Sequence, residues 1–158
     1  MINYNGYHPN IGVVAHNTNR QVLWVKRTNQ DVWQFPHGGI QTSETPKIAM
    51  YRTLFETVGL NQQDVRIISE SHHWVKYNLP IDLIHLKKEK ICMEQKQKWY
   101  LVRLLCNDGA INIKNSHSPE YDDWQWVNYW YPIRYVIPFK KVLYRRIMEE
   151  FSKKLFIL

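Results

Sequence analysis

Residues 11–15 and 22–27, near the start of the chain, have the apolar pattern of two β-strands. Alternation with a period of two is typical of strands, because successive side chains point to opposite faces of a sheet. The polar residues 17–20 between them are suited to a turn. We therefore predict a β-hairpin over this region.

Four more segments have strand-like patterns. Two are long, at residues 65–75 and 98–106, and two are short, at residues 111–113 and 124–127. Together with the hairpin they imply a mixed sheet.

A helix is predicted over residues 46–58. Thr45 is suited to the N-cap, Pro46 to the first helical position and Gly59 to the C-terminal end. The apolar face expected from the helical period consists of Ile48, Ala49, Leu54, Phe55 and Val58.

The C-terminal part of the chain predicts a second amphipathic helix. Its apolar residues recur every four positions, at Phe139, Leu143, Ile147, Phe151 and Leu155. The opposite side is basic and carries Lys140, Lys141, Arg145 and Arg146. Such a face can simply be solvated, or it can contact a polyanion such as RNA.

Length and composition favour a single globular domain spanning residues 1–158, with 44% hydrophobic and 14% aromatic residues and a mean hydropathy of -0.49. No apolar run approaches the roughly 18 residues of a membrane helix, and residues 1–12 lack the pattern of a signal peptide. We therefore expect a cytoplasmic protein with no membrane partner. Cys92 and Cys106 are expected to be reduced thiols in or beside strands.

Charge adds information about possible partners. Lys and Arg number 21 against 14 Asp and Glu, which gives a net charge of +7. This excess favours a polyanion such as a nucleic acid or the phosphates of a nucleotide.

The predicted helix at 46–58 has the spacing of a metal site. Positions 53, 56 and 57 are related as i, i+3 and i+4, so their side chains leave one face together. Three carboxylates there would hold Mg²⁺, which prefers oxygen ligands and bridges proteins to phosphates. In this chain the three residues are Thr53, Glu56 and Thr57.

Glu44 and Arg52 are candidates for an ion pair that holds the loop before the helix. Glu44 can equally be an exposed acid near the helix start, where the helix dipole favours negative charge.

The stretch from His37 to Leu60, HGGIQTSETPKIAMYRTLFETVGL, resembles the signature G-x5-E-x7-R-E-U-x-E-E-x-G-U of the Nudix hydrolases, where U is aliphatic. Seven of the nine defined positions match, and the two glutamates that differ are Thr53 and Thr57. The matching residues are Gly38, Glu44, Arg52, Leu54, Glu56, Gly59 and Leu60. The resemblance implies an α+β fold, an α/β/α sandwich around a mixed sheet.

Other blocks of the chain, among them GYHPNIGVV, WQFPHGGI and SPEYDDWQWV, resemble the family's bacterial RNA pyrophosphohydrolases. The activity implied is that of an RNA 5′-pyrophosphohydrolase, a hydrolase that removes pyrophosphate from the 5′-triphosphate end of RNA and starts mRNA decay. The implied cofactor is Mg²⁺ or another divalent cation such as Mn²⁺, and the implied partner is an RNA 5′ end.

The resemblance assigns roles to individual positions. Glu56 and Glu120 match metal-binding positions, and the catalytic motif also contains Gly38, Gly39, Glu44 and Arg52. At position 37 the usual glutamine is His37, whose backbone carbonyl would still be able to contact metal. The alternative for Asp122 and Asp123, near Glu120, is a solvated acidic turn.

Residues implied to bind RNA provide cations for phosphates and rings for bases. Arg27 and Lys140 match positions that contact the 5′ end, and Phe139 matches a ring on which a base stacks. Tyr77 and Gln95 are expected to line the same cleft. His8 stands where the family's enzymes commonly carry arginine, so its grip on phosphate is expected to be weaker near pH 7.

Threonine at positions 53 and 57 leaves two hypotheses for function. The first is the RNA 5′-pyrophosphohydrolase with impaired turnover, because a neutral hydroxyl is a poor Mg²⁺ ligand and no useful base. The second is a catalytically silent module that binds RNA ends. A role in hydrolysing dinucleoside polyphosphates ranks below both.

Overall fold

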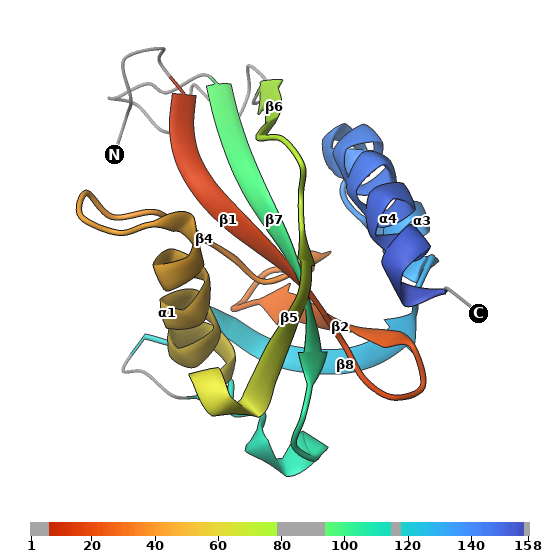
Figure 1. Cartoon of the computed structure of the whole chain (residues 1–158). Coiled ribbons are helices and arrows are strands. Elements are labelled where there is room, and N and C mark those ends of the chain that lie inside the picture. Colours follow the sequence, from red (N-terminus) through yellow and green to blue (C-terminus); the bar gives the residue numbers. More distant parts are fainter. Residues whose placement is uncertain (1–6, 79–93, 115–117, 157–158) are drawn as a thin grey trace.

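The computed structural model describes residues 7–78, 94–114 and 118–156, and within them the strands form one mixed sheet (Figure 1). Its main path runs β3-β2-β1-β7-β5, while β4 pairs with β1, β6 with β7 and β8 with β2. The strands are β1 Tyr7–His16, β2 Gln21–Arg27, β3 Trp33–Gln34, β4 His37–Gly39, β5 Val65–Glu70, β6 Val75–Asn78, β7 Glu94–Leu104 and β8 Tyr121–Asn128.

Helices cover the sheet on both sides (Figure 1). Helix α1, Pro46–Val58, lies on one face, and α3, Tyr131–Tyr135, with α4, Lys141–Leu155, lies on the other. Short 3-10 turns occur at η1 Gln62–Asp64, η2 Asp108–Ala110 and η3 Pro138–Lys140. The predicted α/β/α sandwich is confirmed. Among the described residues, no helix has both the length and the hydropathy needed to cross a bilayer.

Each face of the sheet has its own hydrophobic core, because the central strands are apolar on both sides. In β7, Tyr100 and Val102 pack toward α1, whereas Trp99 and Leu101 pack toward α4. Gly12 of β1 permits this packing, since a Cβ on it would lie 2.7 Å from the buried ring of Trp99, its partner in the parallel β1–β7 ladder.

Helix α1 has the predicted limits and caps. The Thr45 hydroxyl accepts a hydrogen bond from the Ile48 N–H at 3.2 Å, and Gly59 ends the helix in the left-handed region with φ 73°. The predicted apolar face is partly wrong. Ile48 and Phe55 are exposed, while Thr53 and Thr57 are buried.

Tertiary contacts also change several predicted strands. The turn at residues 17–20 is present, but β1 and β2 are in register only at His16 and Val22. Nearer the start of β1, β4 pairs with Asn10, Ile11 and Gly12 instead. The strand predicted at 65–75 is two strands, β5 and β6. Between them the Ser71 N–H donates to the Trp99 carbonyl at 2.8 Å.

One predicted strand is absent, and the ends of three other elements differ from the predictions. Residues 111–113 are not a strand, since Asn112 donates its N–H to the Val58 carbonyl at 2.7 Å and so crosses the end of α1. The strand expected at 98–106 begins at Glu94, and that expected at 124–127 spans Tyr121–Asn128. Phe139 belongs to η3, and the last helix begins at Lys141.

Candidate functional site

The loop before α1 is tied to the helix by the predicted ion pair. The Arg52 Nε lies 2.6 Å from Glu44 Oε2, and its second amino group donates to Glu44 Oε1 at 2.8 Å and to the Gly39 carbonyl at 2.7 Å. This hydrogen bond with Arg52 holds the pKa of Glu44 below its usual value. Glu44 is therefore a bracing residue and not a free acid at the helix start.

Arg52 also reaches Glu56, one turn further along α1. The two groups are 3.0 Å apart, and the Glu56 side chain is 54% exposed. Glu56 is thus accessible to a ligand while one of its oxygens is held by a cation.

The two threonines do not share this exposure. Thr57 donates its hydroxyl to the Thr53 carbonyl at 2.6 Å, inside the helix. The Thr53 hydroxyl is buried without a hydrogen-bond partner, and a Cβ on Gly38 would lie 2.5 Å from it. Of the predicted trio, only Glu56 therefore presents a polar group to the surface.

Glu120 is positioned by the pairing of β2 with β8. A register shift lies between Lys26 and Arg27, beside the start of β8. There the Thr28 N–H donates to the Glu120 carbonyl at 3.0 Å. Tyr121, the next residue, is fully buried, and its hydroxyl accepts the His37 N–H at 3.3 Å. Irregular pairing of this kind commonly re-aims side chains next to active sites.

Charged residues from two other segments, Arg27 and Glu56, affect the pKa of Glu120. Desolvation raises the pKa of its carboxyl above the usual value, the positive charge of Arg27 lowers it, and the negative charge of Glu56 raises it. Two acids distant in sequence, Glu56 and Glu120, are therefore close enough to repel each other, with Arg27 beside them.

Arg27 is also near Lys140, at the start of α4. Burial lowers the pKa of Lys140 to about 8, and the charge of Arg27 contributes in the same direction. The Lys140 ammonium lies 5.9 Å from the centre of the Phe139 ring. Phe139 is half-buried and is not among the residues of either core, so its ring remains available on the cation side of the site.

His8, Gln95 and Tyr77 occupy matching positions on neighbouring strands. His8 of β1 pairs in register with Gln95 of β7, and Gln95 pairs with Tyr77 of β6. Two residues beyond His8, Asn10 pairs with Gly39. The backbone thus aligns the three predicted binding residues across β1, β7 and β6, and β1 also pairs with the glycine pair of β4.

The acids after Glu120 have different surroundings. Asp122 forms an ion pair with Lys26 at 2.7 Å and accepts the Asn29 N–H at 3.0 Å, while Asp123 is exposed. In the part of the chain that the structure describes, no group of three or more His, Cys, Asp or Glu side chains could enclose a metal ion. Cys106 is a free thiol just after β7, and Cys92 lies outside the described residues.

Tyr121 is a positioning residue that sequence reasoning missed. Its hydroxyl also receives Gln34 Nε2 at 3.4 Å, so one buried side chain links β3, β4 and β8. The available signal was its position immediately after Glu120, in a strand whose start was placed three residues too late.

Comparisons with known proteins identify the family and the fold. The NUDIX domain profile matches residues 6–150. RNA pyrophosphohydrolase of Erwinia tasmaniensis is 52% identical over 152 residues, covering 96% of this chain and 87% of that protein. RNA pyrophosphohydrolase of Yersinia pestis is 50% identical with the same coverage.

Solved structures share the fold at low sequence identity. The E. coli dihydroneopterin triphosphate pyrophosphohydrolase superposes with a TM-score of 0.73 at 20% identity, covering 92% of this chain and 96% of that one. A C. elegans Ap4A hydrolase gives a TM-score of 0.64 at 16% identity, with 92% and 98% covered. The matched profile and the close relatives show that this chain belongs to the Nudix hydrolase family.

Proposed function

We propose that this protein is an RNA 5′-pyrophosphohydrolase, which removes pyrophosphate from the 5′-triphosphate end of RNA and so starts mRNA decay. One observation carries the proposal. Glu56, Glu120, Arg27 and Lys140 come from separate segments, yet they are electrostatically connected. The charge of Glu56 raises the pKa of Glu120, and the charge of Arg27 lowers the pKa of both Glu120 and Lys140. An acidic side for a cation thus adjoins a basic side for phosphates, as cleavage of a phosphoanhydride requires. The relatives that are about half identical carry this activity in their names.

Nudix hydrolases generally use divalent cations, and the acidic side of the site suits one. Glu56 and Glu120 repel each other, and a cation between them would remove the repulsion. We infer that Mg²⁺, or Mn²⁺ in its place, is held by these two carboxylates and by the substrate's phosphates. When bound, such an ion neutralises phosphate charge and favours deprotonation of water.

The other residues hold the substrate and the loop. Arg27 and Lys140 bind the phosphate chain, Phe139 stacks on a base, and His8, Tyr77 and Gln95 belong to the same binding face. Glu44 and Arg52 keep the Gly38–Gly39 loop against α1. We propose that the whole chain, residues 1–158, acts as one domain and that it works in the cytoplasm on cellular transcripts.

A second candidate is a silent module that binds RNA 5′ ends without cleaving them. The observation that favours it is that positions 53 and 57 carry buried threonines, so Glu56 is the one acid of the trio. Loss of a general base typically lowers a rate by about 10² to 10⁴. Binding would survive, because Arg27 and Lys140 are unaffected.

The deciding experiment incubates 5′-triphosphorylated RNA with Mg²⁺ and measures 5′-monophosphate RNA. Turnover by the native chain that Glu56→Gln abolishes supports the enzyme. Turnover seen only in the Thr53→Glu/Thr57→Glu variant supports the silent module.

Matched 5′-hydroxyl RNA provides the binding control. If it binds the native chain as tightly as triphosphorylated RNA does, both candidates are rejected.

A further inference from the structure

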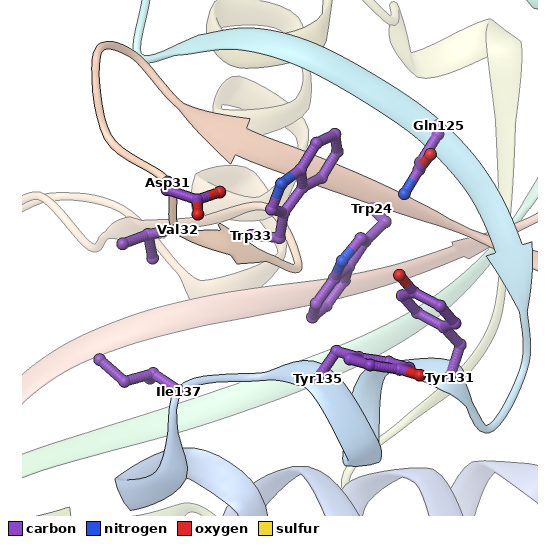
Figure 2. Close-up of a pocket in the computed structure, with 8 residues that line it drawn as sticks. All are labelled: Trp24, Asp31, Val32, Trp33, Gln125, Tyr131, Tyr135 and Ile137. Carbon is purple, nitrogen blue, oxygen red and sulfur yellow. The ribbon is translucent and has the colours of Figure 1, made fainter.

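A pocket of about 320 Å³ is lined by residues of β2, β3, β8 and α3 and of the segments next to them (Figure 2). Four aromatic side chains surround it: Trp24, Trp33, Tyr131 and Tyr135. This volume is at the lower end of the range for small-molecule sites, so the pocket suits a single planar ring system.

Its rings are arranged from a rigid floor to an open mouth. Trp24 is 1% exposed and contacts Tyr131 edge to face, with 6.4 Å between ring centres. Tyr135 is tilted by 32° against Tyr131 at 4.3 Å, yet it is 56% exposed. Tyr131 is half-buried and lies between the exposed Tyr135 ring and the buried Trp24 ring, so Tyr135 is a preformed surface for stacking.

Polar groups lie at two edges of the pocket. Figure 2 shows the Asp31 carboxylate beside Trp33, and the Gln125 amide on the opposite side, on β8. A carboxylate accepts hydrogen bonds from the exocyclic amino groups that adenine, guanine and cytosine carry, whereas uracil offers only its ring N3–H.

Backbone hydrogen bonds connect this pocket to the two cations. The Arg27 N–H donates to the carbonyl of Val32, and the Lys140 N–H donates to the carbonyl of Ile137, both at 2.9 Å. Val32 and Ile137 line the pocket. Each of the two cations is therefore joined through one backbone hydrogen bond to a residue of the pocket lining.

We propose that this pocket binds one unpaired, amino-bearing base of the RNA whose phosphorylated end rests on Arg27 and Lys140. The inference rests on the proposed function, and it adds a base site separate from the ring of Phe139. A free organic cation is the alternative occupant, because Asp31 and four aromatic rings line the pocket, and the test below separates the two.

The test uses four-nucleotide 5′-triphosphorylated RNAs with a 3′ fluorophore, with each nucleotide made abasic in turn. Affinity is measured by anisotropy without divalent cations, so that no turnover occurs. Tyr135→Ala removes the exposed stacking ring, and Tyr135→Phe keeps it. Trp130→Ala is the matched control, because Trp130 adjoins α3, is 47% exposed and does not line the pocket.

We expect Tyr135→Ala to weaken binding at least about 5-fold, as removal of a stacking ring does. Tyr135→Phe and Trp130→Ala should match the native chain. At one nucleotide position the abasic change should weaken RNA binding by the native chain. The same change should have little further effect on RNA binding by Tyr135→Ala. At that position Asp31→Asn should remove the preference for amino-bearing bases over uracil.

The inference would be overturned if the effects of the abasic change and of Tyr135→Ala on affinity were additive at all four positions. Equal losses of affinity in Tyr135→Ala and Trp130→Ala would overturn it as well. So would competition for the pocket by tetramethylammonium, read from tryptophan fluorescence, without coupling to any base. Failure of the proposed function is distinct: triphosphorylated and 5′-hydroxyl RNA would then bind alike, whatever Tyr135→Ala does. If the triphosphate preference persists and Tyr135→Ala has no effect, only the pocket inference is wrong.

Discussion

Glu120 is a residue at which ligand binding and folding have opposite requirements. Its pKa is raised, first by desolvation and then by Glu56. Such a carboxyl favours the folded state when protonated, below its ordinary pKa near 4.5, and this contribution is lost as pH rises through the folded pKa. At neutral pH the ionised group is therefore a source of instability, which a bound cation would remove.

We expect Glu120→Gln to raise the melting temperature at pH 7 in EDTA, because the amide removes the desolvated charge. The gain should shrink as pH falls through the pKa of Glu120. Calorimetric titration with Mn²⁺ should show weaker binding by the same variant. Asp123→Asn, at the exposed acid nearby, should change neither property. A lower melting temperature for Glu120→Gln would contradict this account.

Lys140 predicts a pH dependence for RNA binding. Its pKa of about 8 means that the ammonium loses its proton just above neutral pH. Affinity for triphosphorylated RNA should therefore fall between pH 7 and 9, by up to roughly tenfold per pH unit. Lys140→Arg should flatten the profile, since arginine stays charged. An identical decline in the arginine variant would assign the pH effect to another group.

At the scale of elements, the contact between β4 and α1 depends on the absence of a side chain at Gly38. A Cβ there would lie 2.5 Å from the Thr53 hydroxyl and 3.1 Å from its methyl group. We expect Gly38→Ala to destabilise the protein by about 1–3 kcal/mol through overpacking. Adding Thr53→Ala should recover part of the loss, measured by denaturant unfolding. Additive losses in the double variant would show that the two residues do not collide.

The ion pair between the loop and α1 makes a second prediction at this scale. Glu44 is 11% exposed, and Arg52 lowers its pKa. Its stabilisation is present above the ordinary value of 4.5 and is lost as pH falls through the lower folded pKa. Glu44→Gln should lower the free energy of unfolding by about 1.5–3 kcal/mol at pH 7, and this difference from the native chain should shrink in acid.

Glu56→Gln is the matched control for stability, because Glu56 pairs with the same arginine but is 54% exposed. Glu56→Gln should lower the free energy of unfolding by no more than about 1 kcal/mol. Equal unfolding free energies for the Glu44 and Glu56 variants would show that burial of the pair contributes nothing.

Across the whole molecule, the net charge of +7 does not act uniformly. Arg27 and Lys140 are close enough to influence each other, whereas Arg146 of α4 lines a surface with Glu149 and Glu150. This mixed neighbourhood favours the solvated interpretation of the basic face of α4. The chain's affinity for RNA should therefore depend on few of its cations.

Salt titration measures that difference. For single-stranded RNA, each lost phosphate contact should reduce the slope of log affinity against log salt by roughly 0.7. Arg27→Gln and Lys140→Gln should each show the reduction, and Arg146→Gln should not. A comparable reduction of the slope in Arg146→Gln would show that α4 also contacts the RNA.

The sequence by itself determined the features that depend on near neighbours in the chain. The limits of α1, its Thr45 and Gly59 caps and the Glu44–Arg52 pair follow from residues at most eight positions apart. The family signature identified Glu56 as a candidate, and the resemblance of the block SPEYDDWQWV identified Glu120. Apolar periodicity also indicated most of the long segments that enter the sheet, although it placed several strand ends wrongly, missed β3 and β4 and added a strand at residues 111–113.

Only the tertiary structure decided how distant segments meet. Periodicity indicates that a face is buried but not which element covers it, so it could not exclude Ile48 and Phe55 from the core of α1 or include Thr53 and Thr57. Pairing of β2 with β8 brings Glu120 to Arg27, and packing of α4 on the sheet brings Lys140 to the same place. These contacts join residues about 90 to 110 positions apart, where burial of the whole core, and not local preference, selects the partner.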